Sequence, residues 1–182
     1  MKKVAVILAE GFEEIEAITP IDLLLRAGIS VVPVGVDKTK IKGAHGFSVN
    51  LEILVDSLKD DLDGVVIPGG LPGAENIAKS PAAKKVINRV WKEGGMVAAI
   101  CAAPGLVLGP MGILAGKNAT CYPGFEGNMT GAKPSSQPVV TDGSIITSKG
   151  PGTAFVFSLE IIRFLCGDAK AEEIRKATQY GK

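Results

Sequence analysis

The chain has 182 residues, enough for one domain with a sizeable core, and no repeat, low-complexity segment or linker divides it. Its formal net charge is +1 and aromatic residues make up 5% of it, which argues against a nucleic-acid surface or stacking platforms for single strands. No stretch is apolar for long enough to cross a bilayer, and the apolar start of the chain lacks a convincing signal-peptide cleavage site. We therefore expect one domain over residues 1–182, with neither nucleic acid nor a membrane as a partner.

Short apolar runs alternate with segments of helical periodicity along the chain, which is typical of an α/β fold with a mostly parallel sheet. The predicted strands cover residues 3–9, 29–36, 64–67, 96–100, 117–122, 138–140 and 145–147. The predicted helices cover residues 12–28, 81–93, 104–114, 153–165 and 169–179. Residues 38–54 are expected to make a hairpin-like excursion at an edge, and residues 56–63 a short helical link. Asp142-Gly143 predicts the turn of a hairpin between the last two strands.

The first predicted helix carries apolar residues at helical spacing, which predicts a stripe facing the core. These residues are Ile15, Ile18, Ile21, Leu24 and Leu25. Pro20 interrupts the stripe and is expected to kink the helix, and Gly28 is a natural C-terminal stop. Glu10 and Glu13 fit a solvated first turn of the helix. Glu16 lies beside the apolar stripe, where burial would raise the pKa of its carboxyl and keep it partly protonated.

The stretch from Gly94 to Pro104 is the centre of the functional interpretation. A short apolar run stops abruptly at Cys101, and a helix is expected to begin directly after it. Such a strand-to-helix turn has the geometry of a nucleophile elbow, and a helix N-terminus lowers the pKa of a thiol by stabilising the thiolate. The alternative is that Cys101 is a small buried hydrophobic residue, because free cysteines are often buried.

A glycine-rich loop is expected to bind a ligand at the same edge of the sheet. Pro68-Gly69-Gly70 directly follows the predicted strand 64–67, and two glycines let backbone amides approach a ligand closely. The alternative is an ordinary tight turn, but a place at the carboxyl end of a buried strand favours ligand binding. The only histidine, His45, lies in the edge excursion and is interpreted as a surface or interface residue, so a general base near Cys101 is expected to be a carboxylate.

The three cysteines, at positions 101, 121 and 166, are an odd and sparse set without a CxxC pair. With a single histidine beside them, a zinc site of the Cys/His type is not expected, and reduced thiols in the cytoplasm are the simplest interpretation. Cys121 and Cys166 are interpreted as structural. Cys166 in particular is expected to be buried, because it closes an apolar helix.

Four segments together resemble the ThiJ/PfpI superfamily, in the branch of the Parkinson-disease protein deglycase and its bacterial relatives. They are VILAEGFEEIE at 6–16, IPGG at 67–70, AAICAAP at 98–104 and TSKGPGT at 147–153. They follow the order of the family and span nearly the whole chain. The resemblance implies a flavodoxin-like three-layer α/β/α sandwich, of the class I glutamine amidotransferase-like kind, that forms a homodimer.

The resemblance also implies a site and an activity. Cys101 would be the nucleophile, hydrogen-bonded to a protonated Glu16, and an oxyanion would be held by backbone amides. The implied oxyanion and binding positions are Gly69, Gly70, Ala102, Gly150 and Pro151. Enzymes similar to this one convert methylglyoxal or glyoxal to lactate or glycolate without a metal or another cofactor, and some are described as deglycases of early glycation adducts. Such a protein would protect against carbonyl and oxidative stress.

Two alternatives to this activity stay open. In a redox sensor or chaperone-like protein, Cys101 would instead be oxidised to the sulfinate. A cysteine peptidase is the weaker alternative, because the protease-like branch has a histidine directly after the cysteine and this chain has Ala102.

Tyr122 stands near a position where the deglycase branch often has a histidine, so no role of that histidine transfers to this chain. His45 stands about where some relatives have an interface arginine, and Arg26 either reaches across a dimer contact or complements the C-terminus of its helix.

Overall fold

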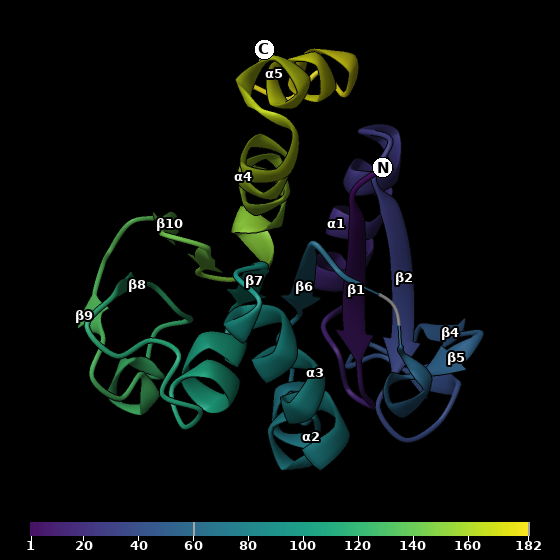
Figure 1. Cartoon of the computed structure of the whole chain (residues 1–182), viewed down its shortest axis with the longest axis vertical. Coiled ribbons are helices and arrows are strands. Elements are labelled where there is room, and N and C mark those ends of the chain that lie inside the picture. The colour runs from purple at the N-terminus through teal and green to yellow at the C-terminus, as the bar shows by residue number, and fades with distance from the viewer. Residues whose placement is uncertain (60, 182) are drawn as a thin grey trace.

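The computed structural model describes residues 1–59 and 61–181 and has a central seven-stranded sheet (Figure 1). Its strands are β1 (Lys3–Leu8), β2 (Ser30–Gly35), β5 (Ile53–Leu54), β6 (Gly64–Ile67), β7 (Met96–Ile100), β10 (Val139–Asp142) and β11 (Ile145–Ser148). Their order across the sheet is β10-β11-β7-β6-β1-β2-β5. The pairs are parallel except for β10 and β11, which form the predicted antiparallel hairpin.

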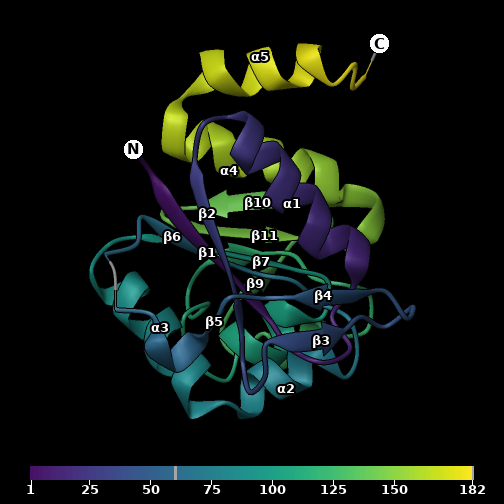
Figure 2. The ribbon, with the colours of Figure 1, turned by 90° about the vertical axis from the view of Figure 1, so that its right-hand side faces the viewer.

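Helices cover both faces of this sheet, as Figure 2 shows. On one side lie α1 (Glu14–Arg26) and α4 (Ala154–Cys166), with α5 (Asp168–Ala177) packed on α4. On the other side lie α2 (Gly73–Lys79), α3 (Pro81–Lys92) and the π-helical turn η2 (Pro104–Leu108). This arrangement confirms the predicted flavodoxin-like sandwich with a mostly parallel sheet.

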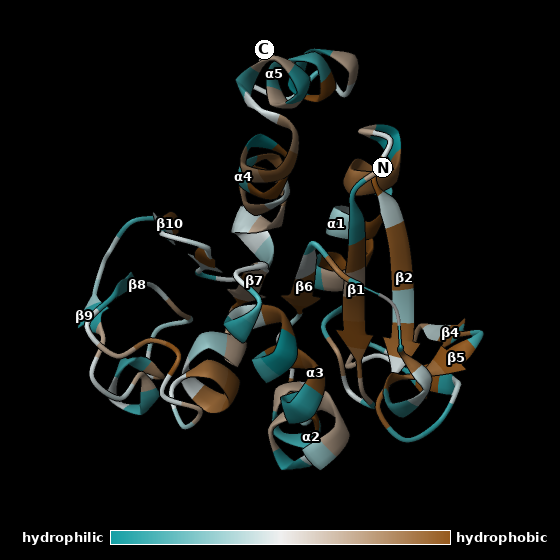
Figure 3. Cartoon of the chain, viewed as in Figure 1, coloured by the Kyte–Doolittle hydropathy of each residue, from teal (hydrophilic) through white to brown (hydrophobic). Residues whose placement is uncertain are grey.

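The central strands are buried on both faces, because successive residues of a strand point to opposite sides. Val4 and Val6 of β1 pack against the layer of α1 and α4, whereas Ala5 and Ile7 pack against the layer of α2 and α3. Figure 3 accordingly shows β1 as a mainly hydrophobic strand. This two-sided burial explains why the strands are continuous apolar runs in the sequence.

Several shorter elements lie outside the seven-stranded sheet. The predicted edge excursion is a hairpin of β3 (Lys40–Lys42) and β4 (Ser48–Asn50). The remaining short elements are β8 (Asn118–Ala119), β9 (Lys133–Pro134) and the 3-10 turns η1 (Val55–Ser57), η3 (Glu126–Asn128) and η4 (Pro151–Thr153). The predicted link over 56–63 is helical only in η1, and its residue 60 lies outside the described residues. None of the described helices is long and apolar enough to cross a membrane.

The predicted core stripe of the first helix is wrong for most of its members. Ile15, Ile18 and Leu25 are 52%, 40% and 55% exposed, whereas Leu24 is fully buried. The buried face of α1 consists of Glu16, Ala17, Pro20, Leu23 and Leu24. The helix has apolar residues on two faces, and periodicity cannot show which of two apolar faces meets the sheet.

Three other local predictions need correction. The helix expected over 104–114 is a single π-helical turn, and residues 109–116 continue as turns because Gly109, Pro110 and Gly112 interrupt the helix. Helix α2 was not predicted. The strand expected over 117–122 shortens to β8, and the turn between β10 and β11 is Gly143-Ser144 rather than Asp142-Gly143.

Candidate functional site

Cys101 lies at the carboxyl end of β7, on the turn that leads into η2. It is one of two described non-glycine residues with a positive φ, at 67°. Its N–H donates to the Ser148 carbonyl over 2.9 Å, and its own carbonyl accepts from the Tyr122 N–H over 2.8 Å. Both backbone groups are therefore bonded to neighbouring segments. These bonds hold a conformation that a side chain adopts only at a cost of about 1–2 kcal/mol.

Glu16 projects from α1 toward the same edge of the sheet and is fully buried. Its Oε2 accepts a hydrogen bond of 2.8 Å from the Gly69 N–H. Its Oε1 has no hydrogen-bond partner within the described parts of the chain. A Cβ at position 69 would meet Cys101 Cβ at 2.6 Å and Glu16 Oε2 at 2.8 Å. Only glycine at this position lets the carboxyl and the thiol lie together.

The backbone N–H groups of Gly70 and Ala102 lie close enough to the thiol of Cys101 to lower its pKa. Gly70 has a φ of +83°, and a Cβ there would meet Glu13 N at 2.4 Å and Gly11 O at 2.6 Å. The loop after β6 thus passes so close to the loop after β1 that a side chain at Gly70 has no space. Two amides and one carboxyl converge on a single sulfur as a result.

Gly150 and Pro151 bring a third loop, the one after β11, to this site. Gly150 is buried, and the position that a Cβ would take there is 3.1 Å from the Tyr122 ring and 3.9 Å from Glu16 Oε1. Pro151 begins η4, directly after it. Tyr122 is 46% exposed and forms part of the rim. The structure therefore places the seven predicted site residues along three adjacent loops and the start of α1.

The electrostatics of Glu16 follow from its burial. Loss of water raises the pKa of Glu16 from 4.5 to about 7, and the charge of Glu13 adds to the effect. Hydrogen bonds from the Gly69 N–H and from Cys101 oppose the shift but do not cancel it. The carboxyl is therefore partly protonated near neutral pH, as an acid that exchanges protons must be.

The pKa of Cys101 moves against the sequence prediction. Burial first, and then the charge and hydrogen bond of Glu16, raise the pKa of Cys101 from 9.0 to about 12. The Gly70 and Ala102 amides lower it, but by less. Because two negative charges cannot share this buried space, the pair carries at most one negative charge near neutral pH. The anion can form on sulfur only when its proton resides on Glu16, and the two amides stabilise that arrangement.

Comparison with known proteins places this geometry in a family. Residues 2–164 match the DJ-1/PfpI family. The chain is also 38% identical over 185 residues to the Parkinson disease protein 7 homolog of Danio rerio, covering 96% of this chain and 95% of that protein. The chain belongs to the DJ-1/PfpI family. This confirms the resemblance drawn from the four sequence segments.

The similarity to other DJ-1/PfpI proteins extends over most of this chain. The chain is 37% identical over 170 residues to the glutathione-independent glyoxalase DJR-1.2 of Caenorhabditis elegans, covering 92% of this chain and 90% of that protein. The oxidized structure of Toxoplasma gondii DJ-1 superimposes with a TM-score of 0.96 at 34% identity, covering 100% of both chains. Protein DJ-1 homolog B of Arabidopsis thaliana is longer: the chain is 36% identical to it but spans only 40% of its length.

Some residues near the DJ-1/PfpI site were missed or misjudged from the sequence. Glu13, interpreted as solvated, is only 8% exposed and lies close enough to influence Glu16. Ser148 anchors the elbow through its carbonyl, and its hydroxyl lies 2.6 Å from that of Thr153. Its only sequence signal was its place in the TSKGPGT segment.

The other two cysteines differ from each other. Cys121 is buried, and burial raises the pKa of its thiol to about 11. Cys166 is exposed, so the prediction of a buried thiol there is wrong. It is the last residue of α4, where the helix leaves the sheet and turns into α5. The apolar residues before it therefore do not show which way its side chain points.

Proposed function

We propose that this protein is a cofactor-independent, cysteine-dependent glyoxalase acting on methylglyoxal or glyoxal. The observation that carries the proposal is the buried Glu16 carboxyl held at the Gly69 amide beside Cys101. A partly protonated acid next to a thiol can take the thiol proton and return it elsewhere on the substrate. The name of the Caenorhabditis elegans relative, a glutathione-independent glyoxalase, supports this reaction class.

The proposed reaction begins with attack of Cys101 sulfur on the aldehyde carbon of the 2-oxoaldehyde. The S–C bond forms, the thiol proton moves to Glu16, and the aldehyde oxygen becomes an oxyanion that is then protonated to a hemithioacetal. The amides of Gly70 and Ala102 would hold that oxyanion, an interaction whose loss typically costs about 10²–10³ in rate.

Proton transfer by Glu16 then converts the hemithioacetal through an enediol to a thioester. The hydrogen on the former aldehyde carbon leaves as a proton, and the neighbouring carbonyl carbon gains one. Hydrolysis of the thioester consumes one water, frees the thiol and gives lactate from methylglyoxal. Oxidation of one carbon balances reduction of its neighbour, so no external oxidant or reductant takes part. On an early glycation adduct the sulfur would instead displace the amine at the hemiaminal carbon. The S–C bond forms, the C–N bond breaks, and the amine leaves with the proton that Glu16 took from the thiol, which gives the same hemithioacetal.

The test measures lactate formed from methylglyoxal without glutathione. We expect Cys101→Ser to abolish turnover and Glu16→Gln to lower kcat by at least about 10²-fold, the usual contribution of a general acid–base. Cys166→Ser removes an exposed thiol on a different edge and serves as the control, with unchanged turnover. Normal turnover in the Cys101→Ser protein would refute the proposal.

A redox sensor is the second candidate, because the same amides can hold a sulfinate on Cys101 and a relative was solved in an oxidized state. Two equivalents of peroxide would convert the thiol to the sulfinic acid and form two waters. Mass spectrometry after mild peroxide treatment distinguishes the two functions. Rapid oxidation with negligible lactate formation favours a redox sensor or a chaperone-like protein that uses the same oxidation. A peptidase is least supported, because Ala102 offers no imidazole beside the thiol.

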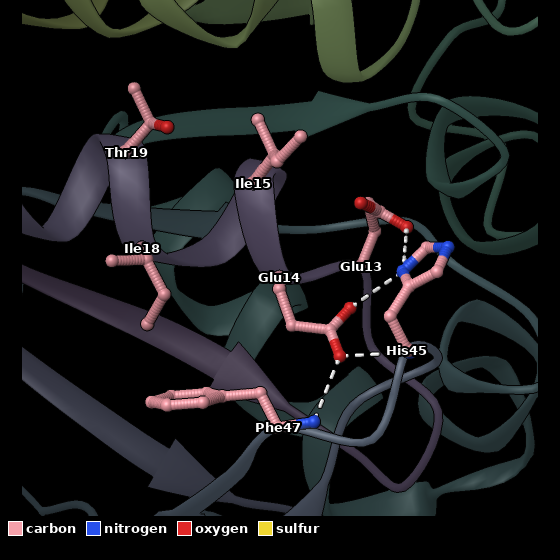
Figure 4. Close-up of a pocket in the computed structure, with 7 residues that line it drawn as sticks. All are labelled: Glu13, Glu14, Ile15, Ile18, Thr19, His45 and Phe47. Carbon is pink, nitrogen blue, oxygen red and sulfur yellow. Dashed lines mark hydrogen bonds and ion pairs between the residues drawn. The ribbon is translucent and has the colours of Figure 1, made fainter.

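We also propose that residues 1–182 act as one domain, in the cytoplasm, and as a homodimer. The apolar outer face of α1 and Phe47, which is 59% exposed, line a surface groove of about 720 Å³ (Figure 4). Exposed apolar patches of this kind mark contact surfaces. Sedimentation analysis of Ile18→Glu should show a monomer, while Phe164→Glu, an exposed apolar position on α4, should remain dimeric. A monomeric unaltered protein would contradict this part of the proposal.

A further inference from the structure

A cluster of three potential metal ligands lies at the start of α1, where its residues form part of the wall of the groove (Figure 4). Glu13 and Glu14 come from the N-terminal end of the helix, and His45 comes from the loop between β3 and β4. One ligand atom from each of the three side chains lies within 4.8 Å of the others. Residues far apart in sequence are thus brought together by the edge hairpin.

The distances within the cluster fit the coordination shell of a small divalent metal ion. His45 Nδ1 is 3.0 Å from Glu14 Oε2 and 3.3 Å from Glu13 Oε2. In a tetrahedral zinc site with bonds of about 2.0–2.1 Å, neighbouring ligand atoms lie about 3.3 Å apart. Imidazole and carboxylate are both common zinc ligands.

The two carboxylates of the cluster share a single hydrogen-bond donor. Both carboxylates converge on one ring nitrogen, which carries at most one proton (Figure 4). Glu13 is 8% exposed, and in the described part of the chain its carboxylate has no partner other than this shared nitrogen. Burying a carboxylate costs free energy unless it is fully paired, and here Glu13 shares its one partner with Glu14. A metal ion in place of the shared proton would pair with both carboxylates.

The surrounding backbone holds the ligands in place. Glu14 Oε1 accepts hydrogen bonds from the His45 N–H at 2.8 Å and the Phe47 N–H at 3.3 Å, which leaves Oε2 facing the imidazole. A Cβ at Gly43 would meet Glu14 Oε1 at 2.4 Å, so glycine there makes room for the carboxylate. The Glu13 N–H is bonded to the Gly69 carbonyl over 3.1 Å. Such supporting bonds orient ligands before the metal arrives.

We propose that Glu13, Glu14 and His45 form a binding site for a divalent transition-metal ion of the Zn²⁺ class and supply three of its ligands. The site uses neither Cys101 nor Glu16, and the proposal does not depend on the proposed glyoxalase activity. Mg²⁺ is not expected to bind in the same way, because it prefers a shell of oxygen ligands in octahedral geometry.

The single histidine allows a direct test, because its imidazole gives one set of nitrogen resonances. We would titrate Zn²⁺ into ¹⁵N-labelled protein in which Cys101 and Cys166 are both serine, so that exposed thiols do not compete. The expected result is a shift of the His45 Nδ1 resonance that saturates at one equivalent, while Mg²⁺ leaves it unmoved. Glu14→Gln and Glu13→Gln should each weaken binding by at least about 10-fold, since each removes a charged ligand.

Two outcomes would overturn the proposal. The first is a His45 resonance that does not move, or drifts without saturation, on addition of Zn²⁺. The second is equal zinc affinity in Glu14→Gln and in the control Glu75→Gln, which changes an exposed carboxylate paired with Lys79 on α2. Circular dichroism spectra of each variant would establish that the fold is retained.

Discussion

The raised pKa of Glu16 predicts a pH-dependent loss of stability that can be measured without any substrate. Burial moves the pKa of this carboxyl from its ordinary 4.5 to about 7 in the folded protein. The folded state therefore binds more protons than the unfolded state between these values, and stability falls as pH rises through them. At about 1.4 kcal/mol per pKa unit, the full effect is about 3 kcal/mol, of which roughly 2–3 kcal/mol develops between pH 5 and 8.

Glu16→Gln removes this titration but keeps an oxygen that can accept the Gly69 N–H. We expect the free energy of unfolding of the unaltered protein to fall by roughly 2–3 kcal/mol relative to Glu16→Gln between pH 5 and 8. Urea unfolding at several pH values gives both curves, and other titrating groups cancel in the difference. In the unaltered protein the thiol does not titrate in this range, because the pKa of Cys101 is raised to about 12.

The control is Ser80→Ala, which changes no ionisable group, so its difference from the unaltered protein should stay constant with pH. Parallel curves for Glu16→Gln and the unaltered protein would refute the reasoning. They would show that Glu16 titrates near its ordinary value and cannot serve as a protonated partner of Cys101.

Two further substitutions test the local geometry. Gly70→Ala should lower the free energy of unfolding by roughly 3 kcal/mol or more, because the new Cβ would combine a positive φ with backbone atoms only 2.4 and 2.6 Å away. The matched control is Gly28→Ala, where φ is +78° but nothing lies within 4 Å, and it should cost only about 1–2 kcal/mol by urea unfolding. Equal costs at the two glycines would contradict the close approach at Gly70. Ser80→Ala should cost about 1 kcal/mol by the same assay, because the Ser80 hydroxyl accepts from the Ala83 N–H at the start of α3, and an unchanged stability would mean that this cap contributes nothing.

Much of the fold could be predicted because its strands are buried on both faces. Such strands appear as continuous apolar runs, and the helices between them follow the short-connection rule of parallel sheets. The segments that the sequence predicts poorly are those in which glycine and proline interrupt the periodicity. There, as in residues 104–116, the choice between helix and turn depends on packing rather than on local preference.

The candidate site divides in a similar way. The positions of Cys101 and Gly70 could be predicted from where the apolar runs end in the sequence. A buried strand that ends at a small residue or at a pair of glycines places those residues at the carboxyl edge of the sheet. The environment of those residues could not be predicted. The pKa of Cys101 rises rather than falls, because burial and the Glu16 charge outweigh the two amides, and this balance depends on distances between segments far apart in the chain.

The layers, the order of strand and helix along the chain, and the loops that carry the candidate site residues therefore follow from the sequence alone. Tertiary structure alone decided which apolar face of α1 is buried, that Glu13 leaves the solvent, and that His45 meets two carboxylates across the edge hairpin. The physical reason is that periodicity records which residues avoid water, whereas charge, proton position and metal affinity depend on what each residue meets after the sheet has formed.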